Sequence, residues 1–151
     1  MKKKYAGYIN LKPLNGVIYP SSIQNILMKN YIENNLKGHF YLSPTEILQA
    51  KFSITLNTLI SNKTKVYGIV MLSCFLLPKN ITERFSIYKS LLESKKKLYF
   101  IFDELKLENK KDKDEIENFI IFNSEYFIKT KKNLNKFENN FMKKYKNISF
   151  V

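Results

Sequence analysis

Polar side chains follow several apolar segments of the chain, at the points where predicted strands end. Two carboxylates, Glu46 and Glu104, could move protons as general acid or base, and the hydroxyl of Ser73 could contact a substrate hydroxyl. The catalytic candidates are Glu46, Glu104 and Ser73. Candidates for binding a polar substrate are Tyr8, Asn10, Tyr19, Thr45 and Arg84. This combination suits isomerisation or epimerisation, which needs acid/base groups and no redox cofactor.

Two pairs of residues have a structural explanation that competes with the functional one. Ser43 and Glu46 stand three residues apart around Pro44, which is the pattern of a capping box at a helix start. Ser21 and Gln24 have the same spacing. The sequence leaves open whether these residues cap helices, belong to a site, or do both.

Arg84 and Cys74 each allow two interpretations. Arg84 is the only arginine and could clamp a phosphate or carboxylate, or make a surface ion pair on its helix. Cys74 would need a base to act as a nucleophile, and the only histidine, His39, starts a predicted strand at the wrong end of the sheet. We therefore interpret Cys74 as a buried structural cysteine.

The elements that position these residues alternate between strand and helix. The apolar run 66–72 predicts a central strand buried on both faces, with further strands at 5–10, 39–42 and 98–102. Helices are predicted at 22–36, at 43–60 and after a cap at Asn80. In the first of these helices, Ile23, Ile26, Leu27 and Tyr31 are expected to face the core.

This alternation predicts an α/β fold with a small three-layer open parallel sheet of four strands, in the order 2-1-3-4 of flavodoxin-like and resolvase-like domains. A ligand would lie at the switch point between the first and third strands. A long basic helix at 113–146 follows a charged linker. The predicted division is therefore an α/β domain at 1–108 and a C-terminal helix at 109–151.

Composition limits the classes of function. The net charge is +13, but with a single arginine among 26 basic residues we interpret the excess as solvated lysine, and nucleic-acid binding is not favoured. The sequence holds no metal-ligand cluster, no Gly-x-Gly-x-x-Gly and no phosphate-loop motif, so no cofactor is predicted. Without a signal peptide or membrane span, a cytoplasmic location is expected.

A set of short motifs carries a resemblance to a known family. The motif residues are Gly7-Tyr8, Pro13, Gly16, Pro20, Gln24-Asn25, Thr45-Glu46, Ser73, Leu77-Pro78, Arg84 and Glu104. In order and spacing they resemble the bacterial sporadic carbohydrate cluster proteins over about residues 5–107. The resemblance implies a role in cell-surface carbohydrate biosynthesis, on a nucleotide sugar or a nonulosonic acid. It adds Gln24 and Asn25 to the substrate-binding candidates.

A looser likeness, in Gly7-Tyr8-Ile9 and the strand 68–72, is to the catalytic domain of serine recombinases. That family has Arg and Ser after its first strand, where this chain has Asn10-Leu11, so the likeness implies the fold and not DNA cleavage.

The sequence thus supports two hypotheses. The first is a cofactor-independent sugar-modifying enzyme or its accessory subunit. The second is an inactive recombinase-like module that binds DNA or forms homodimers through the C-terminal helix.

Overall fold

The computed structural model describes residues 1–48 and 53–145 of the chain. The strands are β1 (Lys4–Ile9), β2 (His39–Thr45), β3 (Gly68–Met71), β4 (Lys97–Phe100) and β5 (Leu105–Leu107). The helices are α1 (Ser21–Asn34), α2 (Ile54–Ile60), α3 (Ile81–Glu93) and α4 (Asp112–Tyr145), with a 3-10 turn, η1, at Cys74–Leu76. The chain divides into two compact units, 1–116 and 117–151.

The five strands form one mixed sheet in the order β2-β1-β3-β4-β5. The order predicted for the first four strands is confirmed, and they are parallel to one another, with Tyr5 beside Gly68 and Gly68 beside Lys97. The prediction of four strands was incomplete, because β5 pairs with β4 in the antiparallel direction. With only three residues, β5 is too short for a periodic pattern to reveal it.

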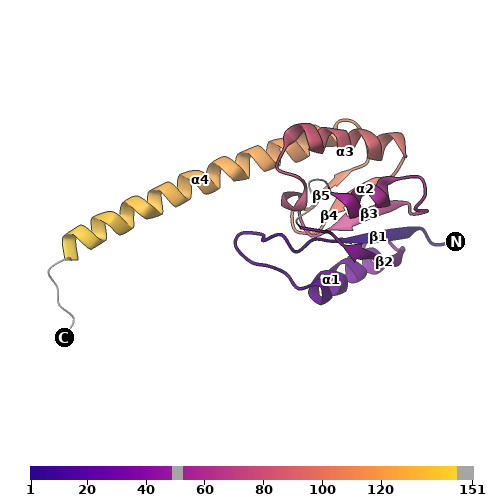
Figure 1. Cartoon of the computed structure of the whole chain (residues 1–151), viewed down its shortest axis with the longest axis horizontal. Coiled ribbons are helices and arrows are strands. Elements are labelled where there is room, and N and C mark those ends of the chain that lie inside the picture. The colour runs from indigo at the N-terminus through magenta and orange to yellow at the C-terminus, as the bar shows by residue number, and fades with distance from the viewer. Residues whose placement is uncertain (49–52, 146–151) are drawn as a thin grey trace. The chain divides into compact units, whose positions relative to one another are not determined.

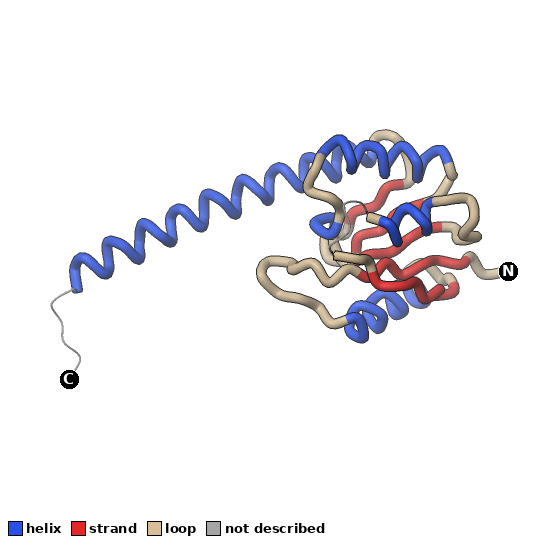
Figure 2. Tube along the Cα trace, viewed as in Figure 1, coloured by secondary structure: helices blue, strands red, loops and turns tan. Residues whose placement is uncertain are grey.

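Helices cover both faces of the sheet, as predicted for a three-layer α/β fold (Figures 1 and 2). The helix α1 lies on one face, and α2 and α3 lie on the other. All four residues of β3 are buried, as expected for the central strand of such a sheet. At Gly7 on β1, a Cβ atom would come 2.6 Å from the Phe40 ring, so a larger residue would force that ring to move.

The predicted helix at 43–60 was wrong over residues 43–48. Residues 43–45 belong to β2, and the Ser43 hydroxyl donates a hydrogen bond to the carbonyl of Gly7 on the neighbouring strand. Pro44 is tolerated there because β2 is an edge strand. The helix α2 begins only at Ile54. Residues 49–52 of the predicted helix lie outside the described residues.

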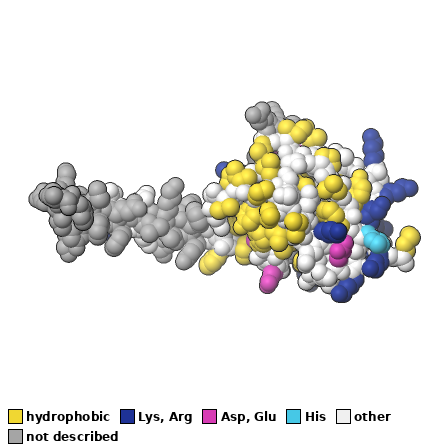
Figure 3. Space-filling model, turned by 90° about the horizontal axis from the view of Figure 1, so that it is seen from below, with side chains coloured by type: hydrophobic (Ala, Val, Ile, Leu, Met, Phe, Trp, Pro, Cys, Tyr) yellow, Lys and Arg dark blue, Asp and Glu magenta, His cyan; other side chains and the backbone are white. Residues whose placement is uncertain are grey.

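The predicted buried face of α1 was wrong for Ile23 and Ile26, while Leu27 and Tyr31 are partly buried. Ile23 is 43% and Ile26 63% exposed, whereas Gln24, Met28 and Ile32 are buried. The side chain of Gln24 points inward because its amide bonds to the backbone of Asn10, the residue after β1, and Ile23 and Ile26 then face outward. Figure 3 shows hydrophobic side chains gathered over this side of the molecule. The large exposed apolar residues of α1 and the loop before it are Val17, Ile18, Ile23 and Ile26.

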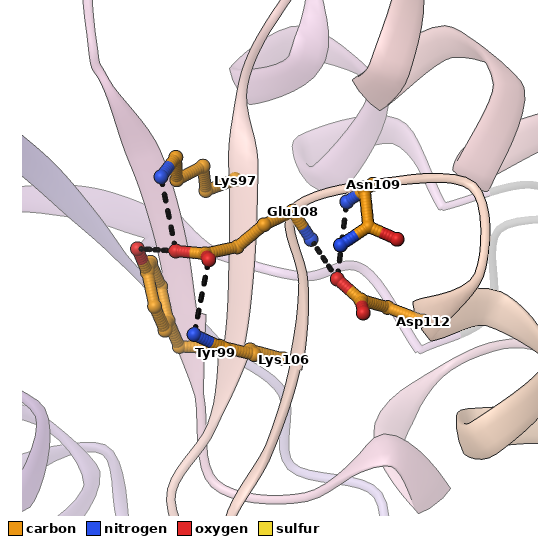
Figure 4. A network of polar contacts seen from close by, with 6 residues as sticks. All are labelled: Lys97, Tyr99, Lys106, Glu108, Asn109 and Asp112. Atoms are coloured by element: carbon orange, nitrogen blue, oxygen red, sulfur yellow. Dashed lines mark hydrogen bonds and ion pairs between the residues drawn. The ribbon is translucent and has the colours of Figure 1, made fainter.

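The segment 105–112 is attached to β4 through Glu108 (Figure 4). The Glu108 carboxylate pairs with Lys106 Nζ at 3.0 Å and accepts hydrogen bonds from Lys97 Nζ and the Tyr99 hydroxyl, both at 3.0 Å. Asp112 Oδ2 in turn accepts the backbone N–H of Glu108 at 2.7 Å. These contacts join β4, β5 and the start of α4 within the first unit.

This arrangement predicts a loss of stability in acid. The contact with Lys106, followed by those with Lys97 and Tyr99, lowers the pKa of Glu108 from 4.5 to about 2. Because the folded-state pKa is the lower one, the stabilisation is present above pH 4.5 and is lost as the pH falls toward 2. Solvent screening of the partly exposed carboxylate limits it to about 1–2 kcal/mol.

The measurement is urea unfolding at a series of pH values, in the wild type and in Glu108→Gln. The variant should lose about 1–2 kcal/mol less than the wild type between pH 5 and pH 2. Parallel curves for the two proteins over this range would show that Glu108 does not carry the acid sensitivity.

Candidate functional site

Four of the predicted site residues meet beyond the carboxyl end of β1. The Tyr8 hydroxyl donates to Glu46 Oε2 at 3.0 Å and accepts from Asn10 Nδ2 at 3.1 Å. Gln24 reaches the same point from α1, where its Nε2 donates to the Asn10 carbonyl at 2.8 Å and its Oε1 accepts the Asn10 N–H at 3.2 Å. The structure therefore brings Tyr8, Asn10, Gln24 and Glu46 into one buried network.

Within this network, the Glu46 carboxylate holds the start of α2. Its carboxylate accepts the backbone N–H groups of Thr55 and Leu56, the first turn of α2, and that of Ile47, each at 3.1 Å. With the Tyr8 hydroxyl this makes four hydrogen bonds, which is about as many as a carboxylate can accept. The predicted capping box with Ser43 is thus wrong, and Glu46 instead binds the start of α2, which begins later than the predicted helix.

Tyr8 is buried too deeply to meet a ligand directly. Its side chain is fully buried, and burial followed by the neighbouring Glu46 charge raises the pKa of its hydroxyl above the ordinary value of 10.0. The hydroxyl therefore stays protonated and acts as a donor to Glu46. In this position Tyr8 orients Glu46 and Asn10 and is not itself exposed to a substrate.

The loop after β1 is held by the same network. Gln24 Nε2 also donates to the carbonyl of Tyr19 at 2.7 Å, so the predicted capping box of Ser21 and Gln24 does not form. The Tyr19 ring contacts Phe102 with a centroid separation of 5.4 Å. Oδ1 of Asn25 is buried and has no hydrogen-bond partner in the described part of the chain.

A cavity of about 260 Å³ opens beside this network. Its lining residues come after β1, after β2 and after β3, which is the carboxyl-end rim at the switch point where we predicted a ligand. The polar and charged residues of the lining are Asn10, Lys12, Glu46, Ser53, Lys79 and Glu83. Thr45 ends β2 directly before this rim.

Sequence reasoning missed Lys12, Lys79 and Glu83. Lys12 is half-buried, and its ammonium donates to the carbonyls of Phe75 at 3.0 Å and Leu77 at 3.2 Å. Burial, and then the charges of Lys79 and Arg84, lower the pKa of Lys12. One signal could have revealed Lys12, because it stands in a long loop after the first strand and such loops carry ligands.

Other predicted site residues do not line this cavity. The Ser73 hydroxyl donates to both carboxylate oxygens of Asp103 at 3.0 Å. Arg84 is buried, and its Nη1 donates to the carbonyls of Pro78 at 3.0 Å and Lys79 at 2.7 Å, at the start of α3. The two residues stabilise the rim rather than face the cavity.

Glu104 lies at a different place from Glu46. It lies in the turn between β4 and β5 with a positive φ of 54° and lines a second hollow of about 660 Å³. That hollow includes Tyr31 of α1 and Tyr99 of β4. The two predicted catalytic carboxylates therefore cannot act on one substrate group together.

Within residues 1–48 and 53–145 there is no group of three or more His, Cys, Asp or Glu that could hold a metal ion. The described helices include none that is both long and apolar enough to cross a membrane. No protein-family model matches the chain, and a search of curated proteins found no relative.

Proposed function

We propose that the protein binds a small sugar derivative in the cavity at the rim of β1 and β3, and that it acts in cell-surface carbohydrate biosynthesis. The observation that supports this proposal best is the position of the cavity, at the switch point of a sheet with the 2-1-3-4 order of flavodoxin-like folds. At about 260 Å³ the cavity suits a small ligand. Its lining of amide, hydroxyl, ammonium and carboxylate groups suits a ligand rich in hydroxyls.

The reaction we propose is a cofactor-independent isomerisation or epimerisation. It needs a carboxylate that is free to exchange a proton with the substrate. Glu46 has its acceptor positions occupied, whereas Glu83 lines the cavity and its carboxylate has no hydrogen bond or ion pair among the described residues. Glu83 is therefore the better candidate for proton transfer, and Asn10 for holding a hydroxyl.

The first experiment is thermal unfolding of the purified protein with single additions of nucleotide sugars, nonulosonic acids and a short DNA duplex. A ligand at a hundred times its dissociation constant should stabilise the fold by about 2.7 kcal/mol, a shift of a few degrees for a protein of this size. A shift with one sugar supports the proposal, and Glu83→Gln should then abolish turnover while leaving the shift in place. A shift with duplex DNA alone would favour the DNA-binding alternative instead.

A further inference from the structure

Lys12 carries a positive charge that no carboxylate in the described part of the chain neutralises. Its ammonium is half-buried and has two backbone carbonyls as partners, Phe75 and Leu77. Charges removed from water are normally paired, because the loss of hydration is costly. The two charged groups that act on the Lys12 ammonium, Lys79 and Arg84, are both cations.

Lys96 shows how the same fold stabilises a buried ammonium without a ligand. Its Nζ donates to the carbonyls of Leu59, Ser61 and Thr64 at 2.6–2.8 Å, so all three N–H groups have partners. These carbonyls lie at and just after the C-terminal end of α2, where the helix dipole favours a cation. Lys12 has one carbonyl fewer, its two carbonyls come from the end of the three-residue turn η1 and not from an α-helix, and it lines a cavity.

Arg84 holds the turn before α3, and its guanidinium is not available to the ligand. Its guanidinium is bound to the carbonyls of Pro78 and Lys79, the residues just before α3. Asn80 caps the helix at this point, with Oδ1 accepting from the N–H groups of Thr82 at 2.8 Å and Glu83 at 3.2 Å. This turn places Lys79 in the lining of the cavity that also contains Lys12.

We propose that Lys12 and Lys79 bind an oxyanion, so that the ligand of the cavity is an acidic sugar bearing a carboxylate or a phosphate. The inference rests on the proposed function for the sugar part of the ligand, and on the local charge for the anionic part. Lys12 supplies the buried contact and Lys79, which is exposed, supplies the outer one. Two carboxylates line the cavity. That of Glu46 binds the N–H groups at the start of α2, and that of Glu83 is left to exchange a proton with the substrate.

The test is calorimetric titration of the full chain with four probes. These are N-acetylneuraminic acid, glucose 1-phosphate, neutral glucose and inorganic phosphate. We expect one of the two acidic sugars to bind at least tenfold more tightly than glucose, and which of them binds identifies the anion as carboxylate or phosphate. In Lys12→Met the affinity for that sugar should fall at least tenfold, and in Lys79→Met by a smaller factor.

Two control variants accompany these. Lys63→Met removes an exposed lysine that is absent from the cavity lining, and should leave binding unchanged. Lys12→Gln keeps a donor for the two carbonyls and replaces Lys12→Met if that variant does not fold.

The outcomes separate the inference from the proposed function. Equal affinity for glucose and the acidic sugars, or unchanged acidic-sugar affinity in the Lys12 variant, overturns the oxyanion site and leaves sugar binding in place. Binding of phosphate that depends on Lys12, with no sugar bound, keeps the oxyanion site and overturns the sugar function. Binding of none of the four probes overturns both.

Discussion

Replacing Glu46 with glutamine should lower the free energy of unfolding by about 3 kcal/mol, the largest effect we expect from a conservative substitution in this protein. The carboxylate is 6% exposed and accepts four hydrogen bonds, two of them from the first turn of α2. Glutamine offers a single acceptor oxygen and places an NH₂ group against backbone N–H donors. Hydrogen bonds to a charged group contribute about 1.5–3 kcal/mol, and the unsatisfied donors add to the loss.

The measurement is urea unfolding at pH 7, with Glu83→Gln as the matched control. Both carboxylates line the same cavity, but that of Glu83, in the first turn of α3, accepts no hydrogen bond from the described residues. Its substitution should change stability by less than about 0.5 kcal/mol. If Glu46→Gln instead keeps wild-type stability and loses activity alone, the structural role is wrong and the carboxylate belongs to the reaction.

Replacing Lys96 with methionine should destabilise the protein by about 2–3 kcal/mol. Burial lowers the pKa of Lys96, which shows that loss of hydration opposes its charge, and the three carbonyls offset this cost. Methionine has a similar length and keeps the packing of the alkyl chain, but it leaves the carbonyls of Leu59, Ser61 and Thr64 without a donor. Leaving carbonyls without a donor at a buried helix end lowers the free energy of unfolding more than a surface substitution does.

Lys95→Met is the control for this variant, because Lys95 is the preceding residue and is exposed. We expect its midpoint in urea unfolding to match the wild type. A Lys96→Met variant as stable as the Lys95→Met variant would show that the carbonyls find water in place of the ammonium.

The two variants test how the two ends of the same helix, α2, are stabilised. The helix α2 has only seven residues and no side-chain cap of its own at Ser53, so it would not persist in isolation. Glu46 binds its N-terminal end and Lys96 its C-terminal end, each with the charge that the helix dipole favours. Because α2 is a common partner of both, the effects of the two substitutions should be less than additive in the double variant.

Patterns that depend on neighbouring residues predicted much of this fold. The continuous apolar run at 66–72 identified β3 as the buried centre of the sheet, and the alternation of elements gave the order of four parallel strands. Asn80 caps α3 as predicted, and the charged run at 112–115 begins α4. In these cases the interactions that form the element are between residues close together in the sequence.

The site depended on contacts between distant segments. Glu46 and Ser43 have the spacing of a capping box, yet Glu46 caps a helix that begins eight residues later, because β2 continues through Pro44. The spacing of Ser21 and Gln24 allowed a capping box, but Gln24 instead binds Asn10, 14 residues away at the end of β1, and Ile23 and Ile26 face outward. Lys12 gains its half-buried environment only from the loop after β3, more than 60 residues on. Local spacing therefore predicted four of the five strands and three of the helices, while the tertiary structure added β5 and decided which polar groups hold the fold and which remain for a ligand.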